Sequence, residues 1–193
     1  MAPAIRPGVF HTRGGSLVKR RIIAAALAIL AATAAAVGGA APAFADDHFD
    51  VGIQNWGNEK CLAPQGESYA DGVAIVQVPC TGSVFQRWDF IDHDNHVFQI
   101  RNAATLKCID ALGGATNGTA VVQWPCASIS NQRWQASRDL PDFVYLRSRV
   151  AGTSSHCLDV PGDSNATNQA LQIYVCNNTE AQYWGVGVGI HRS

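Results

Sequence analysis

Short alternations of apolar and polar residues run along the chain from about residue 51 to residue 186. Such runs, separated by turn residues, are typical of half-buried β-strands. Twelve strands are expected in three groups of four: 51–56, 60–62, 74–78 and 87–90; 97–100, 107–110, 120–124 and 133–135; and 143–146, 156–160, 170–174 and 183–186. No segment of this part shows helical periodicity, so the pattern predicts an all-β, closed architecture.

A Gln-x-Trp tripeptide closes each group, at residues 86–88, 132–134 and 182–184. The steps between successive Trp residues are 46 and 50, which places three units at about 51–91, 97–138 and 143–188. A fixed period of this kind indicates a repeat architecture. One unit of four short strands cannot bury its apolar face alone, so the three units are expected to close around a common axis. Trp88, Trp134 and Trp184 are then core residues, because Trp buries a large area.

Two cysteines occur in register with the Trp of each unit. Six cysteines allow many connectivities, and the repeat selects the pairing within each unit: Cys61–Cys80, Cys108–Cys126 and Cys157–Cys176. Each bridge closes a short loop, for which chain entropy gives about 3 kcal/mol. A zinc site would need clustered ligands such as Cys-x-x-Cys, and the sequence has none. We therefore expect disulfides, and neither a metal nor another cofactor.

The first 45 residues have the order of a secretory signal peptide. An apolar run at 22–37 and an Ala-Phe-Ala cleavage signature at 43–45 follow a basic head of five residues: Arg6, Arg13, Lys19, Arg20 and Arg21. A membrane anchor is the alternative, but the run is short for a span of about 20 residues. The Arg pair fits a twin-arginine signal poorly. We expect a signal peptide at 1–45 and a single secreted, extracellular domain at 46–193.

Removal of the signal would leave nine basic and 15 acidic residues, a net charge of −6. Because no basic stripe remains, nucleic acid and anionic membrane are poor partners for the mature chain. About 145 residues suffice for one buried core. We expect the mature chain to be monomeric.

Three cysteine-bridged units that end in Gln-x-Trp, with Cys-Ile-Asp at 108–110 and Cys-Leu-Asp at 157–159, resemble the ricin-type lectin domain. This family is also called carbohydrate-binding module family thirteen. The resemblance covers the chain from about residue 50 to residue 188. It implies a twelve-strand β-trefoil with up to three shallow sugar sites, one per unit. Each site uses an Asp two residues after the first cysteine, an aromatic residue two before the second, and an Asn just ahead of Gln-x-Trp.

These residue types suit sugar chemistry. A carboxylate accepts hydrogen bonds from two hydroxyls, an aromatic face packs on the apolar C–H face of the ring, and an amide both donates and accepts. The second unit has the full set, namely Asp110, Trp124 and Asn131, followed by Gln132.

The third unit has Asp159, Tyr174, Asn177 and Gln182, but Ala181 stands where the Asn is expected, so one hydrogen bond is in doubt. The first unit departs at every position, with Ala63 for the Asp, Val78 for the aromatic residue and Phe85 for the Asn. We expect it to be structural. Simple turn capping is the alternative role for Asp110 and Asp159, and Trp124 or Tyr174 alone could be an ordinary strand residue. Their joint occurrence in two units favours sites.

The resemblance therefore predicts a non-catalytic protein that binds galactose- or xylan-type glycans. Glycoside hydrolysis would need two carboxylates about 5–10 Å apart, and Asp110 and Asp159 belong to different units. A β-trefoil protease inhibitor or protein-interaction module is one alternative, and an accessory to a polysaccharide hydrolase is another.

Overall fold

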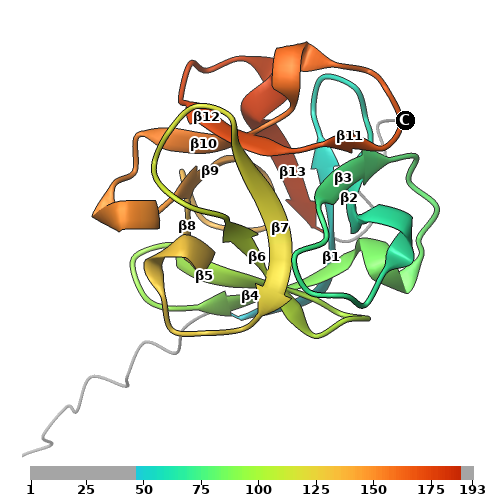
Figure 1. The fold of residues 1–193 in the computed structure, drawn as a ribbon, viewed down its shortest axis with the longest axis horizontal. Coiled ribbons are helices and arrows are strands. Elements are labelled where there is room, and N and C mark those ends of the chain that lie inside the picture. The colour runs from blue at the N-terminus through green and yellow to red at the C-terminus, as the bar shows by residue number, and fades with distance from the viewer. Residues whose placement is uncertain (1–46, 188–193) are drawn as a thin grey trace, which may run out of the picture. The chain divides into compact units, whose positions relative to one another are not determined.

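The computed structural model describes residues 47–187, so the expected signal peptide lies outside the described residues. All twelve expected strands are present, and the all-β prediction is confirmed (Figure 1). Repeat one contains β1 (His48–Asn55), β2 (Cys61–Pro64), β3 (Ile75–Val78) and β4 (Arg87–Asp92). Repeat two contains β5 (Val97–Asn102), β6 (Lys107–Ala111), β7 (Thr119–Pro125) and β8 (Trp134–Ala136). Repeat three contains β9 (Asp142–Ser148), β10 (His156–Asp159), β11 (Gln169–Ala170), β12 (Gln172–Val175) and β13 (Tyr183–Gly187).

The strand expected at 170–174 is divided into β11 and β12 because it changes partners. Residues Gln169 and Ala170 pair with β3 of repeat one, whereas β12 pairs with β10 and β7. The first strand also begins earlier than expected, at His48, because it pairs with β4 across a bulge. At this bulge Asp50 has φ of 57° and forms an ion pair with Arg87.

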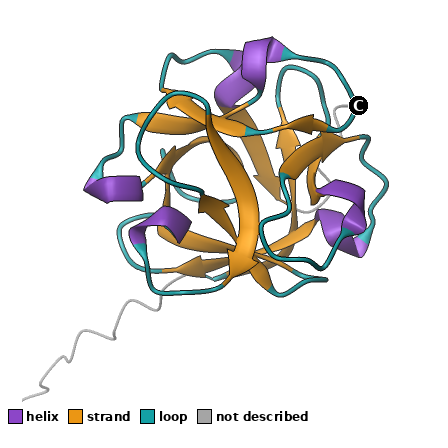
Figure 2. Cartoon of the chain, in the orientation of Figure 1, coloured by secondary structure: helices purple, strands orange, loops and turns teal. Residues whose placement is uncertain are grey.

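Short 3-10 turns lie on the connections between strands (Figure 2). They are η1 (Gln65–Glu67), η2 (Val84–Gln86), η3 (Ser130–Gln132), η4 (Val150–Gly152), η5 (Pro161–Asp163) and η6 (Glu180–Gln182). Three of them, η2, η3 and η6, end at the Gln of a Gln-x-Trp motif and so place this Gln just before a barrel strand. In the described part of the chain, no helix is long and apolar enough to cross a membrane.

Six strands form a closed antiparallel barrel in the order β1, β4, β5, β8, β9 and β13, with β13 pairing back to β1. The other strands form one hairpin per repeat: β2–β3, β6–β7 and β10–β12. Neighbouring hairpins are joined where β11 pairs with β3 and β12 pairs with β7. Three repeats that each contribute two barrel strands and one hairpin make a β-trefoil.

The Trp of each motif lies in the core and holds the hairpin of its own repeat. Trp88, Trp134 and Trp184 are fully buried. Their Nε1 atoms donate to the backbone oxygens of Leu62, Ile109 and Leu158, at 3.2, 3.1 and 3.0 Å. Each acceptor directly follows the first cysteine of its repeat. The same interaction therefore fixes the first hairpin strand in each of the three repeats.

The Gln of each motif holds the second hairpin strand. Its Nε2 donates to the backbone oxygen of the residue before the second cysteine: Pro79, Pro125 or Val175. Its Oε1 accepts from the backbone nitrogen of the residue after that cysteine: Thr81, Ala127 or Asn177. The three disulfides form as the repeat predicts, with Cα–Cα distances of 5.0, 5.0 and 5.1 Å.

We expect Trp88→Phe to lower the free energy of unfolding by about 2–4 kcal/mol, because it opens a cavity and leaves the Leu62 carbonyl without its donor. The same change at Trp124, which is 43% exposed, should lower it by less than about 1 kcal/mol. Urea unfolding of both variants measures the difference. Equal losses would contradict the assigned core role of Trp88.

Candidate functional site

In repeat two, Asp110 and Trp124 lie on the same face of the β6–β7 hairpin. Trp124 is opposite Cys108 in the strand register, and Asp110 is two residues beyond Cys108. Because alternate residues of a strand share a face, the two side chains and the disulfide lie on one surface. The indole is 43% exposed and the carboxylate is buried, with Asp110 only 4% exposed.

Two amides lie at the Asp110 carboxylate. Gln132 Nε2 donates to Asp110 Oδ2 at 3.0 Å, and the Asn131 side chain is close enough to lower the pKa of the carboxyl group. Asn131 Nδ2 donates in addition to the backbone oxygen of Ala111 at 3.1 Å, which fixes its orientation. Burial raises the pKa of Asp110 above its ordinary 3.8, and the hydrogen bonds from Gln132 and Asn131 oppose this shift only in part.

The hydrogen-bonding capacity of the Gln132 amide is used within the protein. Besides Asp110, its Nε2 donates to Pro125, and its Oε1 accepts from the Ala127 backbone and from Gln99 Nε2. Gln132 is also fully buried. It therefore positions the carboxylate and presents no free polar group at the surface.

A loop of repeat one completes the surroundings of Trp124. Gly72 has φ of 73°, and a Cβ atom placed there would lie 2.9 Å from the indole. Its backbone nitrogen donates to Gln123 at 2.9 Å, and the neighbouring Asp71 forms an ion pair with Lys107 at 3.0 Å. The sequence pattern missed this contact because it joins two repeats.

Repeat three brings together the corresponding residues. Asp159 is 4% exposed and Tyr174 is 37% exposed, on the β10–β12 hairpin. Gln182 Nε2 donates to Asp159 Oδ1 at 3.0 Å. A hollow of about 360 Å³ opens beside these residues, lined by Asp159, Val160, Gly162, Asp163, Gln172, Tyr174, Asn177, Thr179 and Ala181.

A second amide reaches Asp159 from a position that the repeat pattern does not mark. Gln172 Nε2 donates to Asp159 Oδ2 at 2.7 Å from the opposite strand. The matching residue in repeat two, opposite Asp110, is Val122. Gln172 thus supplies the hydrogen bond that Ala181 cannot. Only the pairing register within the hairpin could have revealed it.

Burial also raises the pKa of Asp159 above 3.8, and the nearby Asp163 adds to the shift, while the hydrogen bonds from Gln172 and Gln182 oppose it. Asn177 lines the hollow and accepts two hydrogen bonds from Thr179 at its Oδ1 atom. Among the hydrogen bonds of residues 47–187, none uses its Nδ2 atom. Within the described residues, this amide donor is therefore available to a ligand.

Repeat one keeps the motif clamp without the polar site. Ala63 is buried where the carboxylate would lie, and Phe85 packs its ring edge-on against Tyr69 at 5.4 Å. Gln86 still holds the hairpin through Pro79 and Thr81. This repeat therefore contributes packing and no acidic acceptor.

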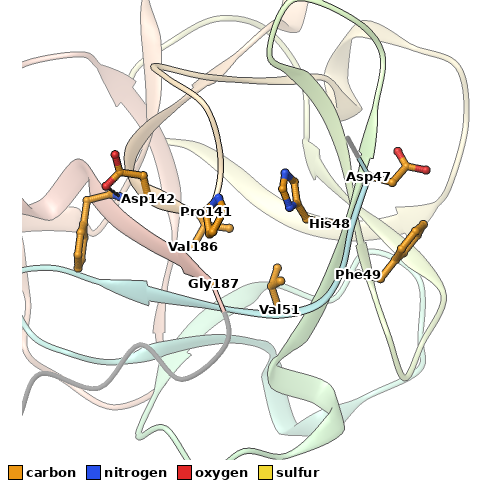
Figure 3. Close-up of a pocket in the computed structure, with 9 residues that line it drawn as sticks. Asp47, His48, Phe49, Val51, Pro141, Asp142, Val186 and Gly187 are labelled. Carbon is orange, nitrogen blue, oxygen red and sulfur yellow. Dashed lines mark hydrogen bonds between the residues drawn. The ribbon is translucent and has the colours of Figure 1, made fainter. Parts of the chain in front are cut away.

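A larger hollow of about 670 Å³ lies elsewhere, beside β1, the Pro141–Phe143 segment and the end of β13. Figure 3 shows its lining side chains, which include Phe49, Val51 and Val186. None of the site residues expected from the sequence is among them. Within residues 47–187, no group of three His, Cys, Asp or Glu side chains could hold a metal ion.

Solved structures share this fold. A designed three-fold symmetric protein, ThreeFoil, matches with a TM-score of 0.66 and 20% identity over 71% of this chain and 96% of its own. A ricin B-like lectin from Macrolepiota procera, solved with lactose, matches with a TM-score of 0.60 and 17% identity over 75% of this chain and 96% of its own. An exo-β-1,3-galactanase from Clostridium thermocellum gives a TM-score of 0.68 and 20% identity over 75% of this chain but only 31% of its own.

No curated protein matches the chain significantly. The family model of the ricin-type β-trefoil lectin domain-like proteins matches residues 45–124, 84–153 and 130–191, and these overlapping matches cover the three repeats. The chain therefore belongs to the ricin-type β-trefoil lectin domain-like family.

Proposed function

We propose that this protein binds carbohydrate at two shallow sites, one in repeat two and one in repeat three. The observation that carries the proposal is a buried, amide-held carboxylate beside an exposed aromatic ring, repeated on the same hairpin face. A fixed carboxylate selects a pair of sugar hydroxyls, and the ring covers the apolar face of the same sugar.

The residues of each site have distinct roles in this proposal. Asp110 and Asp159 accept sugar hydroxyls, while Trp124 and Tyr174 stack on the ring. In repeat two, Asn131 donates a hydrogen bond to the sugar. In repeat three, the Nδ2 atom of Asn177 is the corresponding donor. The buried amides Gln132 and Gln182 orient the carboxylates instead of touching the sugar.

We infer a galactose- or xylan-type ligand. Supporting the first class, similar structures include the lactose complex of the Macrolepiota lectin and an earthworm lectin solved with GalNAc. Each site is weak alone because it is shallow, and two sites on one barrel gain affinity on a polysaccharide through multivalency. The galactanase match favours a second role, as a non-catalytic accessory to a polysaccharide hydrolase.

We also propose that residues 1–45 are removed on export and that residues 46–193 act outside the cell as one monomeric domain. Three disulfides, with no free cysteine in the described part of the chain, suit an oxidising compartment.

Asp110→Asn and Asp159→Asn should each weaken binding of galactan or xylan oligosaccharides at their own site by about tenfold or more, since a hydroxyl loses a charged acceptor. The double variant should lose nearly all binding. Isothermal titration calorimetry with the mature chain measures these losses.

The matched control is Asp142→Asn, which removes an exposed carboxylate elsewhere and should leave binding unchanged. Full binding by the folded double variant would refute the sites. Binding of no glycan by the folded wild type, with stoichiometric inhibition of a protease, would favour the inhibitor alternative.

Acidification should release the sugar while the protein stays folded. Because burial raises the pKa values of Asp110 and Asp159, both carboxylates take up protons at a pH above their ordinary 3.8. Protonation removes the acceptor that binding needs. Acidification has the opposite effect on folding stability. A raised carboxyl pKa favours the folded state at low pH, and this contribution is lost as the pH rises through the folded-state pKa.

Titration of affinity against pH, with circular dichroism as the check on folding, tests this prediction. The midpoint of the affinity loss should lie above pH 3.8. Affinity that stays constant to below this pH would contradict a role for the ionised carboxylates.

Replacing Gln172 by Val, the residue found at the matching position of repeat two, should weaken the repeat-three site by about three- to tenfold. Adding Ala181→Asn should restore much of the loss, because it returns the amide that repeat two uses. Measurements are best made in an Asp110→Asn background, which isolates the repeat-three site. No loss in Gln172→Val would show that Asp159 Oδ2 needs no amide donor.

A further inference from the structure

Another hollow, of about 400 Å³, is connected to the repeat-two site through η3, because Ser130 lines the hollow and the next residue, Asn131, belongs to the site. Three segments line it: the turn between β4 and β5, the stretch from η3 into β8, and the chain that follows β9. Its lining residues are His93, Asp94, Asn95, Val97, Ser130, Arg133, Gln135, Arg149 and Gly152.

Neither of the two arginines in this hollow forms an ion pair with a carboxylate of residues 47–187. Arg133 Nη1 lies 2.6 Å from His93 Nε2, and its Nη2 donates to Ser128 Oγ at 3.1 Å. Arg149 Nη1 donates to Gln135 Oε1 at 3.2 Å. The backbone nitrogen of Arg149 donates to the backbone oxygen of Arg133 at 2.9 Å, so the two residues are held side by side.

The mature chain has a net charge of −6, so carboxylates are in excess. They form ion pairs with three of the six arginines of the described residues, namely Arg87, Arg101 and Arg138. Arg87 is the most informative, because it occupies the same motif position as Arg133 one repeat earlier. Two hydrogen bonds join it to Asp50, at 3.0 and 2.7 Å.

Partial burial of Arg133 strengthens its attraction for an anion in the hollow. Burial lowers the pKa of Arg133, because part of its hydration is lost without a compensating charge. Asp94 also lines the hollow, but no ion pair joins it to either arginine among residues 47–187. The two guanidinium groups therefore remain available to an oxyanion.

We propose that this hollow binds an oxyanion carried by the glycan, a sulfate ester or a uronic-acid carboxylate, next to the sugar held by repeat two. The two sites share η3, where Ser130 faces the hollow and the next residue, Asn131, lies at Asp110. A guanidinium fork matches the oxygens of either group. This inference rests on the proposed function and narrows it to acidic glycans.

The test compares matched neutral and acidic ligands by calorimetry on the mature chain. Agarose oligosaccharides and their sulfated carrageenan counterparts form one pair, and linear xylo-oligosaccharides with and without a glucuronic acid branch form the other. We expect the acidic member of at least one pair to bind about three- to tenfold more tightly, less so at high salt. The pair that shows the gain identifies sulfate or carboxylate as the source.

Arg133→Gln and Arg149→Gln should each abolish this gain and leave the neutral ligand unaffected. Arg87→Gln, which removes the same charge at the equivalent position of repeat one, should keep the gain. Inorganic sulfate should shift the side-chain NMR signals of Arg133 and Arg149 but not that of Arg87, independently of any sugar.

Equal binding of neutral and acidic ligands would overturn this inference and leave the proposed function standing. An equal loss in all three arginine variants would also overturn it, since that result means general electrostatics. Binding of no ligand by the folded wild type would overturn both proposals.

Discussion

The indole N–H of the motif tryptophan has to find an acceptor inside the barrel, and each hairpin supplies one just after its first cysteine. The motif glutamine then holds the other hairpin strand on both sides of the second cysteine. Disulfide, indole and amide thus fix one hairpin to one barrel strand in each repeat. Repeat one shows that this clamp works without a polar site, since Ala63 replaces the carboxylate there.

The candidate sites add one more hydrogen bond to the same clamp. In repeats two and three the glutamine Nε2 also donates to the buried Asp. The amide that holds the hairpin therefore also orients the carboxylate. Burial of a carboxylate is unfavourable unless donors surround it. A second amide lies at each carboxylate: Asn131 lowers the pKa of Asp110, and Gln172 donates to Asp159. The two sites therefore share a physical requirement, although the second amide comes from the η3 turn in repeat two and from strand β12 in repeat three.

Repetition made the barrel strands, the three disulfides and the buried Trp residues predictable, because each feature occurs in phase three times. Contacts between repeats were not predictable, since they depend on which segments the closed barrel brings together. Gly72 beside Trp124, the division of β11 from β12, and the pairing of Arg133 with Arg149 are of this kind. The role of Gln172 was not predictable from the repeat, because Val122 occupies the matching position of repeat two. The sugar-contacting roles stay predictions from sequence and geometry.

The most direct test of this account is an NMR titration of the mature chain with a galactan or xylan oligosaccharide, following the five Trp indole N–H signals and the backbone amides. We expect shifts at Trp124 and around Asp110, a second set around Asp159 and Tyr174, and none at Trp88 or in strand β2. Shifts confined to repeat one, or to the hollow beside β1, would contradict it.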